Sequence, residues 1–385
     1  MNFEQLFSDN KETRLFGRYV TNTHIEPILK NTEENFDVSI AGRSVLDEPI
    51  YSIKAGYGKT KIFMWSQMHG NEATTTKAIF DFLNLLKGDT VLATQLKQSF
   101  TFLILPVLNP DGARLYTRAN AVDVDLNRDS LNLTQPESQL IRKMFEEFKP
   151  DYCYNMHDQR TIFGVGDIPK PATVSFLAPS YNDDRDINEC RQKAINVIAA
   201  MNETLQEFIP GQVGRFDDSF NINCIGDMFQ SLNVPTILFE AGHYPNDYER
   251  EETRKYIFFA LLSGFNAINE NVIVVNKKKE YFNIPQNKII FYDMIWKNVK
   301  INYENKEKIA NFASQYKEVL FENSIIFQAI ISEIGNLEGF YGHEEFDAFG
   351  AEYQDEELNK TPIIGNKADF SFGPDNKFVN GQKIK

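Results

Sequence analysis

Two short segments of this chain carry side chains whose types and spacing could do chemistry. His69–Glu72 (H-G-N-E) places an imidazole and a carboxylate three residues apart. If a helix starts there, both side chains can converge on one metal ion; a catalytic zinc takes three N or O ligands and keeps one position open. In Asp125–Arg128 (D-L-N-R), the guanidinium can hold a carboxylate through two hydrogen bonds. The two segments together predict a metal site next to a carboxylate-binding group.

A third metal ligand must come from elsewhere, and His157 is the strongest candidate. It ends the apolar run 152–156, just as His69 follows the apolar run 61–66. Both runs have the length of buried strands. Because ligands bind at the strand ends of open α/β sheets, we expect the two imidazoles to meet there. The other histidines fit less well: His24 lies in the lead-in, His343 lies near the C-terminus, and His243 follows Glu240 closely as a bystander or supporting group.

Glu240 is the candidate acid and base. It follows the apolar run 236–239, which places its carboxylate on the rim of the sheet where the metal ligands are expected. Each feature alone has a simpler explanation. A glutamate at a helix start is favoured by the helix dipole, and Arg128 could form a loop salt bridge with Asp123 or Asp125. The ordered combination favours a catalytic site.

Apolar runs and apolar stripes alternate along the first 270 residues. Strands are expected at 36–41, 49–55, 61–66, 100–107, 152–156, 173–177 and 236–239, and helices at 73–86, 136–148, 186–208 and 247–268. Residues 109–112 (N-P-D-G) are expected to form a β-turn. This alternation predicts an α/β fold with a mixed, mostly parallel central sheet flanked by helices.

The composition changes after residue 269. Short β-like runs are expected at 289–292 and 299–303, with a helix near 306–320. We therefore predict a catalytic domain over residues 1–269, with a lead-in at 1–35. A smaller, mainly β accessory domain is expected over residues 270–385, and the sequence does not indicate its role.

Bulk composition limits the function classes. The 385 residues carry a net charge of -14, so the surface should repel nucleic acid and anionic membranes. The three cysteines are sparse, odd in number and without C-x-x-C spacing, which favours a reducing compartment. Residues 1–10 lack signal-peptide features, and no apolar run approaches the roughly 20 residues of a spanning helix. We expect a cytoplasmic protein without nucleic-acid or membrane partners, of unspecified oligomeric state.

Taken in order, the motifs resemble those of the zinc carboxypeptidase family (metallocarboxypeptidases), across roughly residues 36–268. The matching features are H-G-N-E at 69–72, N-P-D-G at 109–112, D-L-N-R at 125–128, His157 after one strand and Glu240 after another. The resemblance implies one Zn²⁺ per chain, held by His69, Glu72 and His157. It also implies the zinc-peptidase type of α/β fold.

The resemblance also implies roles for the remaining site residues. Glu240 would be the general base and acid. Asn127 and Arg128 would bind the terminal carboxylate of the substrate, and Arg118 would polarise the scissile carbonyl. The implied reaction is hydrolysis of the C-terminal amide bond of a peptide by a zinc-activated water. The substrate would be a peptide or another small carboxylate-bearing molecule, with a side-chain preference that the sequence does not specify.

Two departures from the family pattern stand out. Many members carry a tyrosine on a mobile loop roughly twenty residues before the catalytic glutamate, where this chain reads R-F-D-D-S-F at 215–220. No tyrosine lid is therefore expected, and the sequence does not say what replaces it. The residues after His157 are Asp158 and Gln159 in place of the usual Ser-Tyr pair, and we expect them to shape a different pocket.

Two other functions compete with a carboxypeptidase. An acylase of the aspartoacylase and succinylglutamate desuccinylase type would share the motifs at 69–72 and 125–128 but split an N-acyl amino acid. The 109–112 motif and Arg118 favour the peptidase. A catalytically inactive binding module would keep the fold to hold a carboxylate, although every expected catalytic position is filled. Metal analysis and a hydrolysis screen separate the three.

Overall fold

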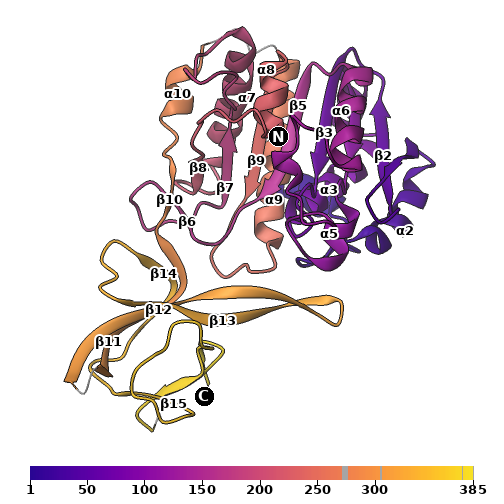
Figure 1. The fold of residues 1–385 in the computed structure, drawn as a ribbon. Helices are drawn as coiled ribbons and strands as arrows, with labels where there is room; N and C mark the ends of the chain where they lie inside the picture. Colours follow the sequence, from indigo (N-terminus) through magenta and orange to yellow (C-terminus); the bar gives the residue numbers. More distant parts are fainter. Residues whose placement is uncertain (271–275, 304–305, 375, 385) are drawn as a thin grey trace. The chain divides into compact units, whose positions relative to one another are not determined.

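The structure, a computed structural model, describes residues 1–270, 276–303, 306–374 and 376–384. These residues form two compact units (Figure 1). The first comprises Met1–Gln159 and Ala172–Asn287, and the second comprises Arg160–Pro171 and Lys288–Lys385. The chain thus leaves the first unit two residues after His157 and returns to it at Ala172.

The first unit is built on a mixed sheet, as the sequence predicted. Its eight strands lie in the order β1 (Asp37–Arg43), β2 (Pro49–Gly56), β4 (Phe100–Leu105), β3 (Thr60–Ser66), β5 (Tyr152–Asp158), β9 (Thr236–Ala241), β7 (Val174–Leu177) and β8 (Val213–Arg215). The four central strands, β4, β3, β5 and β9, run parallel to one another. Their carboxyl ends therefore share one edge of the sheet. At this edge His69 follows β3, and His157 and Glu240 lie near the ends of β5 and β9.

Helices cover both faces of this sheet (Figure 1). They are α1 (Phe3–Asn10), α2 (Asn22–Thr32), α3 (Thr74–Lys87), α4 (Val91–Ser99), α5 (Pro110–Leu115), α6 (Pro136–Phe148), α7 (Glu189–Leu205), α8 (Ile225–Ser231), α9 (Glu251–Asn269) and α10 (Lys278–Phe282), with a 3-10 turn, η1, at Leu126–Arg128. Among the described residues, no helix has the length and apolarity needed to cross a membrane.

Side-chain alternation in the central strands explains the two covered faces. In β3, Ile62 and Met64 belong to the core shared with α3, α7 and α9. The intervening residues Phe63 and Trp65 belong to the core shared with α6 and α8. Because successive side chains of a strand point to opposite faces, a continuous apolar run is buried on both sides.

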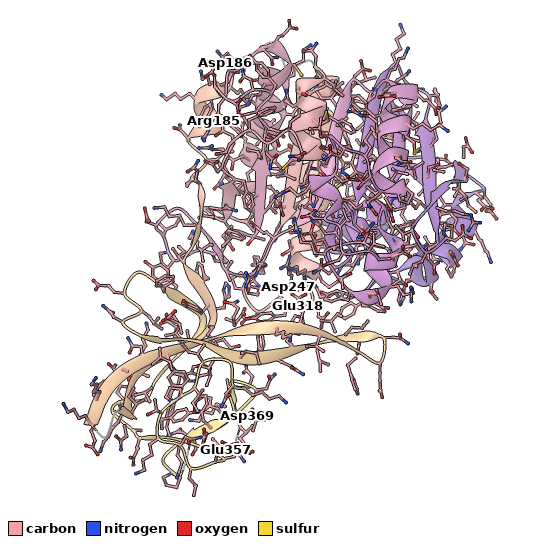
Figure 2. All side chains as sticks on the ribbon, viewed as in Figure 1. Arg185, Asp186, Asp247, Glu318, Glu357 and Asp369 are labelled. Carbon is pink, nitrogen blue, oxygen red and sulfur yellow. The ribbon has the colours of Figure 1, made fainter. Side chains whose placement is uncertain are left out.

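A side-chain cap fixes the start of helix α9. Asp247, labelled in Figure 2, precedes α9 and accepts hydrogen bonds from the backbone N–H groups of Glu251 (2.9 Å) and Glu252 (2.8 Å). These donors have no partner inside the helix, so a carboxylate at this position stabilises the helix start.

The second unit is mainly β, as expected. One sheet has the order β13 (Ser324–Gly335), β12 (Lys306–Phe321), β11 (Phe291–Tyr303) and β14 (Tyr341–Asp347). Another has β15 (Tyr353–Asp355), β16 (Phe370–Phe372), β17 (Asn376–Val379) and β18 (Gln382–Lys383), and β6 (Phe163–Val165) pairs with β10 (Asn287–Ile289). The aromatic core includes Trp296 stacked on Phe312, with ring centroids 4.8 Å apart. The accessory role of residues 270–385 stays a prediction.

The predicted helix near 306–320 is wrong. These residues form strand β12, which pairs antiparallel with both β11 and β13. Ile309, Phe312 and Tyr316 recur at a spacing that is typical of one face of a helix. Phe312 instead packs in the sheet core, and β propensity depends on such long-range partners more than on local pattern.

Candidate active site

Three side chains from two distant segments converge at the carboxyl edge of the sheet. Nδ1 of His69 lies 2.8 Å from one carboxylate oxygen of Glu72, and Nδ1 of His157 lies 2.8 Å from the other. The two Nδ1 atoms are 3.0 Å apart. The structure therefore brings together the three residues predicted as metal ligands, all of them buried.

The segment between β3 and α3 is shaped by close backbone packing. Gly70 lies so near the start of α5 that a Cβ atom there would meet the carbonyl carbon of Gly112 at 2.0 Å. Asn109 caps α5, because its side chain accepts a hydrogen bond from the N–H of Gly112 (2.8 Å). Residues 109–112 are thus a capped helix start rather than the predicted β-turn, and they support the loop that carries His69 and Glu72.

Asp125 orients the His69 ring. Nε2 of His69 lies 3.1 Å from Oδ1 of Asp125. Burial opposes protonation of His69, but the carboxylates of Glu72 and Asp125 outweigh it and raise the pKa. A proton held on Nε2 beside Asp125 leaves the Nδ1 lone pair directed at the convergence point, which is the usual arrangement of a metal-binding histidine.

The other two ligands are held in the states that a metal requires. Burial lowers the pKa of His157, which favours the neutral imidazole. Burial would raise the pKa of Glu72, but the two imidazoles overcome it and hold that pKa well below the usual range. A neutral imidazole and an ionised carboxylate are both metal-binding forms.

This donor set fits zinc. Ligand atoms that each lie about 2.1 Å from a tetrahedral zinc are about 3.4 Å from one another, close to the 2.8–3.0 Å separations seen here. Two imidazole nitrogens and one carboxylate are also a ligand set that catalytic zinc uses. At most one proton fits between the facing Nδ1 atoms, whereas a single cation satisfies all three groups at once.

Glu240 lies beside His157 in the sheet. The two residues are register partners in the parallel pairing of β5 with β9. Burial, together with the nearby carboxylates of Glu72 and Asp158, raises the pKa of Glu240 well above its ordinary value. A cation at the three ligands would oppose this shift by favouring the ionised form.

Arg118 lies in the segment between α5 and η1, and its side chain contacts one of the candidate metal ligands. Its Nη1 lies 3.3 Å from Glu72, and its Nε donates to Asp125 at 3.1 Å. About half of the side chain is exposed (49%), so the guanidinium can also meet a ligand from solvent. The residue predicted to polarise a carbonyl therefore lies at the metal site.

Asn127 and Arg128 lie on the turn η1, which Asp125 caps by accepting the N–H of Asn127 (2.9 Å). The side-chain oxygen of Asn127 accepts the N–H of Ile225 (3.0 Å), which directs the amide nitrogen away from α8. Arg128 is exposed, and its Nη1 donates to the carbonyl of Asn127 (2.7 Å) and approaches Sγ of Cys224 (3.2 Å). Its acidic neighbour Asp125 is engaged by His69 and Arg118 instead.

The sequence did not predict that Asp125 supports His69 and Arg118. The position of an acid two residues before Asn127 is a signal that could have suggested it. Asp158 and Gln159 were expected to shape a pocket. Both side chains are buried, and Nε2 of Gln159 donates to the carbonyl of Ala172 (2.7 Å). They therefore belong to the packing around the site.

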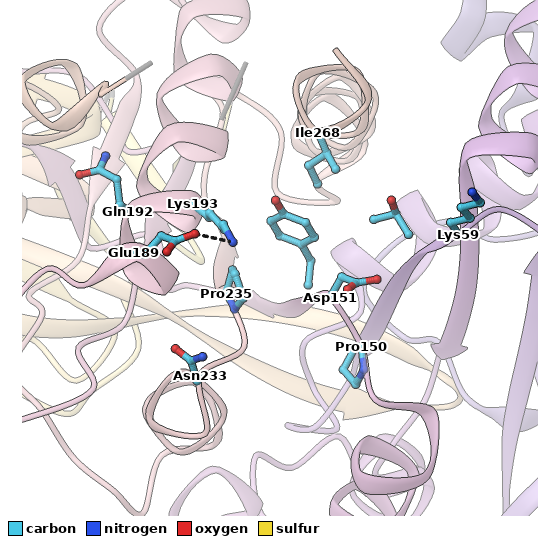
Figure 3. Close-up of a pocket in the computed structure, with 11 residues that line it drawn as sticks. Lys59, Pro150, Asp151, Glu189, Gln192, Lys193, Asn233, Pro235 and Ile268 are labelled. Carbon is cyan, nitrogen blue, oxygen red and sulfur yellow. Dashed lines mark ion pairs between the residues drawn. The ribbon is translucent and has the colours of Figure 1, made fainter. Parts of the chain in front are cut away.

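A separate hollow of about 760 Å³ lies at the amino edge of the sheet (Figure 3). Its walls include Thr60 at the start of β3 and Tyr152 at the start of β5, with the ion pair of Glu189 and Lys193 at 3.2 Å. The candidate metal ligands lie at the opposite ends of the same strands. This hollow is therefore not part of the candidate active site.

Comparison with known proteins agrees with this geometry. Residues 23–161 match the profile of the family described as zinc carboxypeptidase. Carboxypeptidase 2 of Trichophyton tonsurans is 29% identical over 139 residues, covering 35% of this chain and 26% of that protein. Carboxypeptidase SOL1 of Arabidopsis thaliana is 29% identical over 218 residues, covering 46% and 44%. The match thus spans about a quarter to a half of the length of these curated relatives.

Solved structures share the fold. A metallo-carboxypeptidase from Burkholderia cenocepacia superposes with a TM-score of 0.52 at 15% identity, covering 65% of this chain and 70% of its own. Carboxypeptidase A from Helicoverpa armigera gives 0.50 at 16% identity, covering 70% and 80%. Residues 23–161 thus match the zinc carboxypeptidase family, and the first unit shares the fold of these solved structures. The family uses zinc, and among the described residues His69, Glu72 and His157 form a group that could hold a metal ion.

Proposed function

We propose that this protein is a zinc metallocarboxypeptidase that hydrolyses the C-terminal amide bond of a peptide. The observation that carries the proposal is the convergence of His69, Glu72 and His157 on one point, with Glu240 beside His157 in the sheet register. The sequence matches cover only part of the relatives' length, so the complete reaction is our proposal.

Zinc held by the three ligands would supply a Lewis acid for the carbonyl and would lower the pKa of bound water to about 7. Glu240 then accepts a proton from the water as its oxygen bonds to the carbonyl carbon. When the C–N bond breaks, Glu240 gives that proton to the leaving nitrogen, so one water is consumed per bond cleaved. Arg118 faces the same site and would donate hydrogen bonds to the carbonyl oxygen as negative charge develops there.

Asn127 and Arg128 would hold the free carboxylate of the terminal residue. A guanidinium matches the two oxygens of a carboxylate, and the amide nitrogen of Asn127 adds a neutral donor on the same turn. Arg128 is exposed, which suits a group that must meet a substrate from solvent. This pair would restrict cleavage to the last residue of a chain.

A substrate panel tests the proposal. Zinc-loaded protein is incubated with blocked dipeptides, their C-terminal amides, and acetyl- and succinyl-amino acids, and released amino acids are measured. Release from the free-acid peptides alone supports the carboxypeptidase. Release from the N-acyl amino acids alone would assign an acylase, and protein that holds no stoichiometric zinc and hydrolyses nothing in the panel would favour a binding module.

The location of the protein in the cytoplasm stays a prediction.

A further inference from the structure

Asp158 caps the helix that follows the metal-binding loop. Helix α3 begins after Ala73, which has no side-chain acceptor for the first amide groups. Oδ2 of Asp158 accepts the N–H of Thr74 (3.0 Å), and Oδ1 lies 3.4 Å from the N–H of Thr75. The N–H of Asp158 itself donates to Oε2 of Glu72 (3.1 Å). One residue thus joins the strand of His157 to the segment that carries Glu72.

Arg250 joins the same strand end to the strand of Glu240. Its Nη2 donates to the carbonyl of Gln159 (2.6 Å), directly after β5, and its Nη1 donates to the carbonyl of Ala241 (2.6 Å), the last residue of β9. Nη1 also lies 3.9 Å from Oδ2 of Asp158. The Asp158 and Arg250 side chains are 2% and 1% exposed, so both charges are held inside the fold.

The loop before α9 fixes Arg250 in turn. Arg250 has a left-handed backbone, with φ of 58°, one residue before the helix that Asp247 caps. Oγ1 of Thr253, in the first turn of that helix, donates to the carbonyl of Gly242 (3.2 Å). Hydrogen bonds of Asp247 and Thr253 therefore hold the backbone on either side of Arg250, so that its guanidinium points at the strand ends.

We propose that Asp158 and Arg250 form a positioning clamp, which sets the geometry of the zinc ligands and of Glu240 without touching either metal or substrate. The clamp links the three elements of the site: the loop of His69 and Glu72, strand β5 and strand β9. The inference rests on the proposed zinc site. It also gives the departure from Ser at position 158 a purpose, because a carboxylate offers one oxygen to each amide while its negative charge faces the guanidinium, and a serine hydroxyl has a single neutral oxygen.

A second buried ion pair, which has only a structural role, serves as a matched control. Arg254 and Asp81 are both fully buried and lie 2.5 Å apart, joining α9 to the middle of α3. This pair contacts none of the strand ends that carry the ligands, as far as the described residues show. Disrupting it should weaken the fold but leave the metal geometry intact.

The test compares Asp158→Asn and Arg250→Lys with Asp81→Asn and Arg254→Lys in the full chain. Zinc dissociation constants are measured by competition with a chromophoric chelator, together with the unfolding temperature of the metal-free protein and the visible spectrum of the Co²⁺-substituted protein. Partners that orient ligands typically contribute about 10- to 100-fold in metal affinity. We expect a loss of that size and an altered Co²⁺ spectrum in the clamp variants alone, while all four variants lower the unfolding temperature.

The outcomes separate this inference from the proposed function. Clamp variants with wild-type zinc affinity and Co²⁺ spectrum would overturn the inference alone, provided that the wild type binds zinc. An equal loss of zinc affinity in clamp and control variants would also overturn the inference. So would clamp variants that fail to fold while the control variants fold. Each of these results would mean that Asp158 and Arg250 contribute only to general stability. A wild-type protein that binds no zinc would instead overturn the proposed function.

Discussion

His157 and Glu240 are register partners on two neighbouring parallel strands, β5 and β9. Neighbouring strands lie about 4.8 Å apart, so backbone pairing alone places a candidate metal ligand and a candidate proton acceptor side by side. A loop would hold such a pair less rigidly. The relationship also explains why His157 and Glu240 each follow an apolar run in the sequence, although 83 positions (240 minus 157) separate them.

Metal removal should abolish activity reversibly. Chelation followed by dialysis should leave inactive protein, and stoichiometric Zn²⁺ should restore turnover. Replacing a ligand by His157→Ala should weaken zinc binding by more than the roughly 10- to 100-fold typical of outer partners. His24→Gln, which alters a histidine in helix α2, should bind zinc normally. Full activity in exhaustively chelated protein would contradict the prediction.

Glu240→Gln should retain zinc and lose turnover. The amide keeps the size of the side chain but cannot accept the proton of water, and general acid–base catalysis typically contributes about 100- to 10,000-fold. We therefore expect kcat to fall within or beyond that range at unchanged zinc stoichiometry. Turnover near the wild-type rate would remove Glu240 from the reaction.

Arg128→Ala should harm only substrates with a free carboxylate. Hydrogen bonds to charged groups contribute about 1.5–3 kcal/mol, so kcat/KM for a blocked dipeptide should fall roughly 10- to 150-fold. Arg114→Ala, which removes a comparably exposed arginine (49%), is the control and should have no effect. An equal fall for the C-terminal amide would mean that Arg128 does not bind the carboxylate.

The second unit should lose stability in mild acid. Burial lowers the pKa of His343, which stacks on Phe291, to about 4. The unfolded chain therefore binds a proton below its ordinary pKa of 6.5, while the folded unit resists it. Stability is full above pH 6.5 and falls as the pH drops toward 4, by up to about 3 kcal/mol.

Tryptophan fluorescence can follow this change, because Trp296 lies in the core of the second unit and Trp65 in the first. In a Trp65→Phe background, denaturant unfolding between pH 7 and pH 4 should show the loss. His343→Gln should flatten the dependence in that window. A slope unchanged by His343→Gln would assign the effect to other groups.

Local patterns predicted the elements that surround the site. The expected helix 136–148 coincides with α6, because a proline at its start and an apolar stripe are both local signals. The strand runs before His157 and Glu240 were also found, since buried parallel strands are continuously apolar. Both the fold class and the convergence of the three candidate ligands followed from these elements.

Features that depend on distant contacts were missed. The segment 160–171 belongs to the second unit, and only its pairing there reveals this. Asp158 and Arg250 act on backbone groups that become neighbours only after folding, so no local spacing marks them. The sequence of strand β12 has apolar residues at helical spacing, and only its pairing with β11 and β13 identifies it as a strand.

Anomalous diffraction at the zinc edge, from crystals of zinc-loaded protein, would locate the metal relative to its three candidate ligands. We expect one strong peak per chain, bonded to Nδ1 of His69, Nδ1 of His157 and the carboxylate of Glu72, with the Glu240 side chain facing the open position. Zinc bound elsewhere, or imidazoles turned away from Glu72, would contradict this expectation.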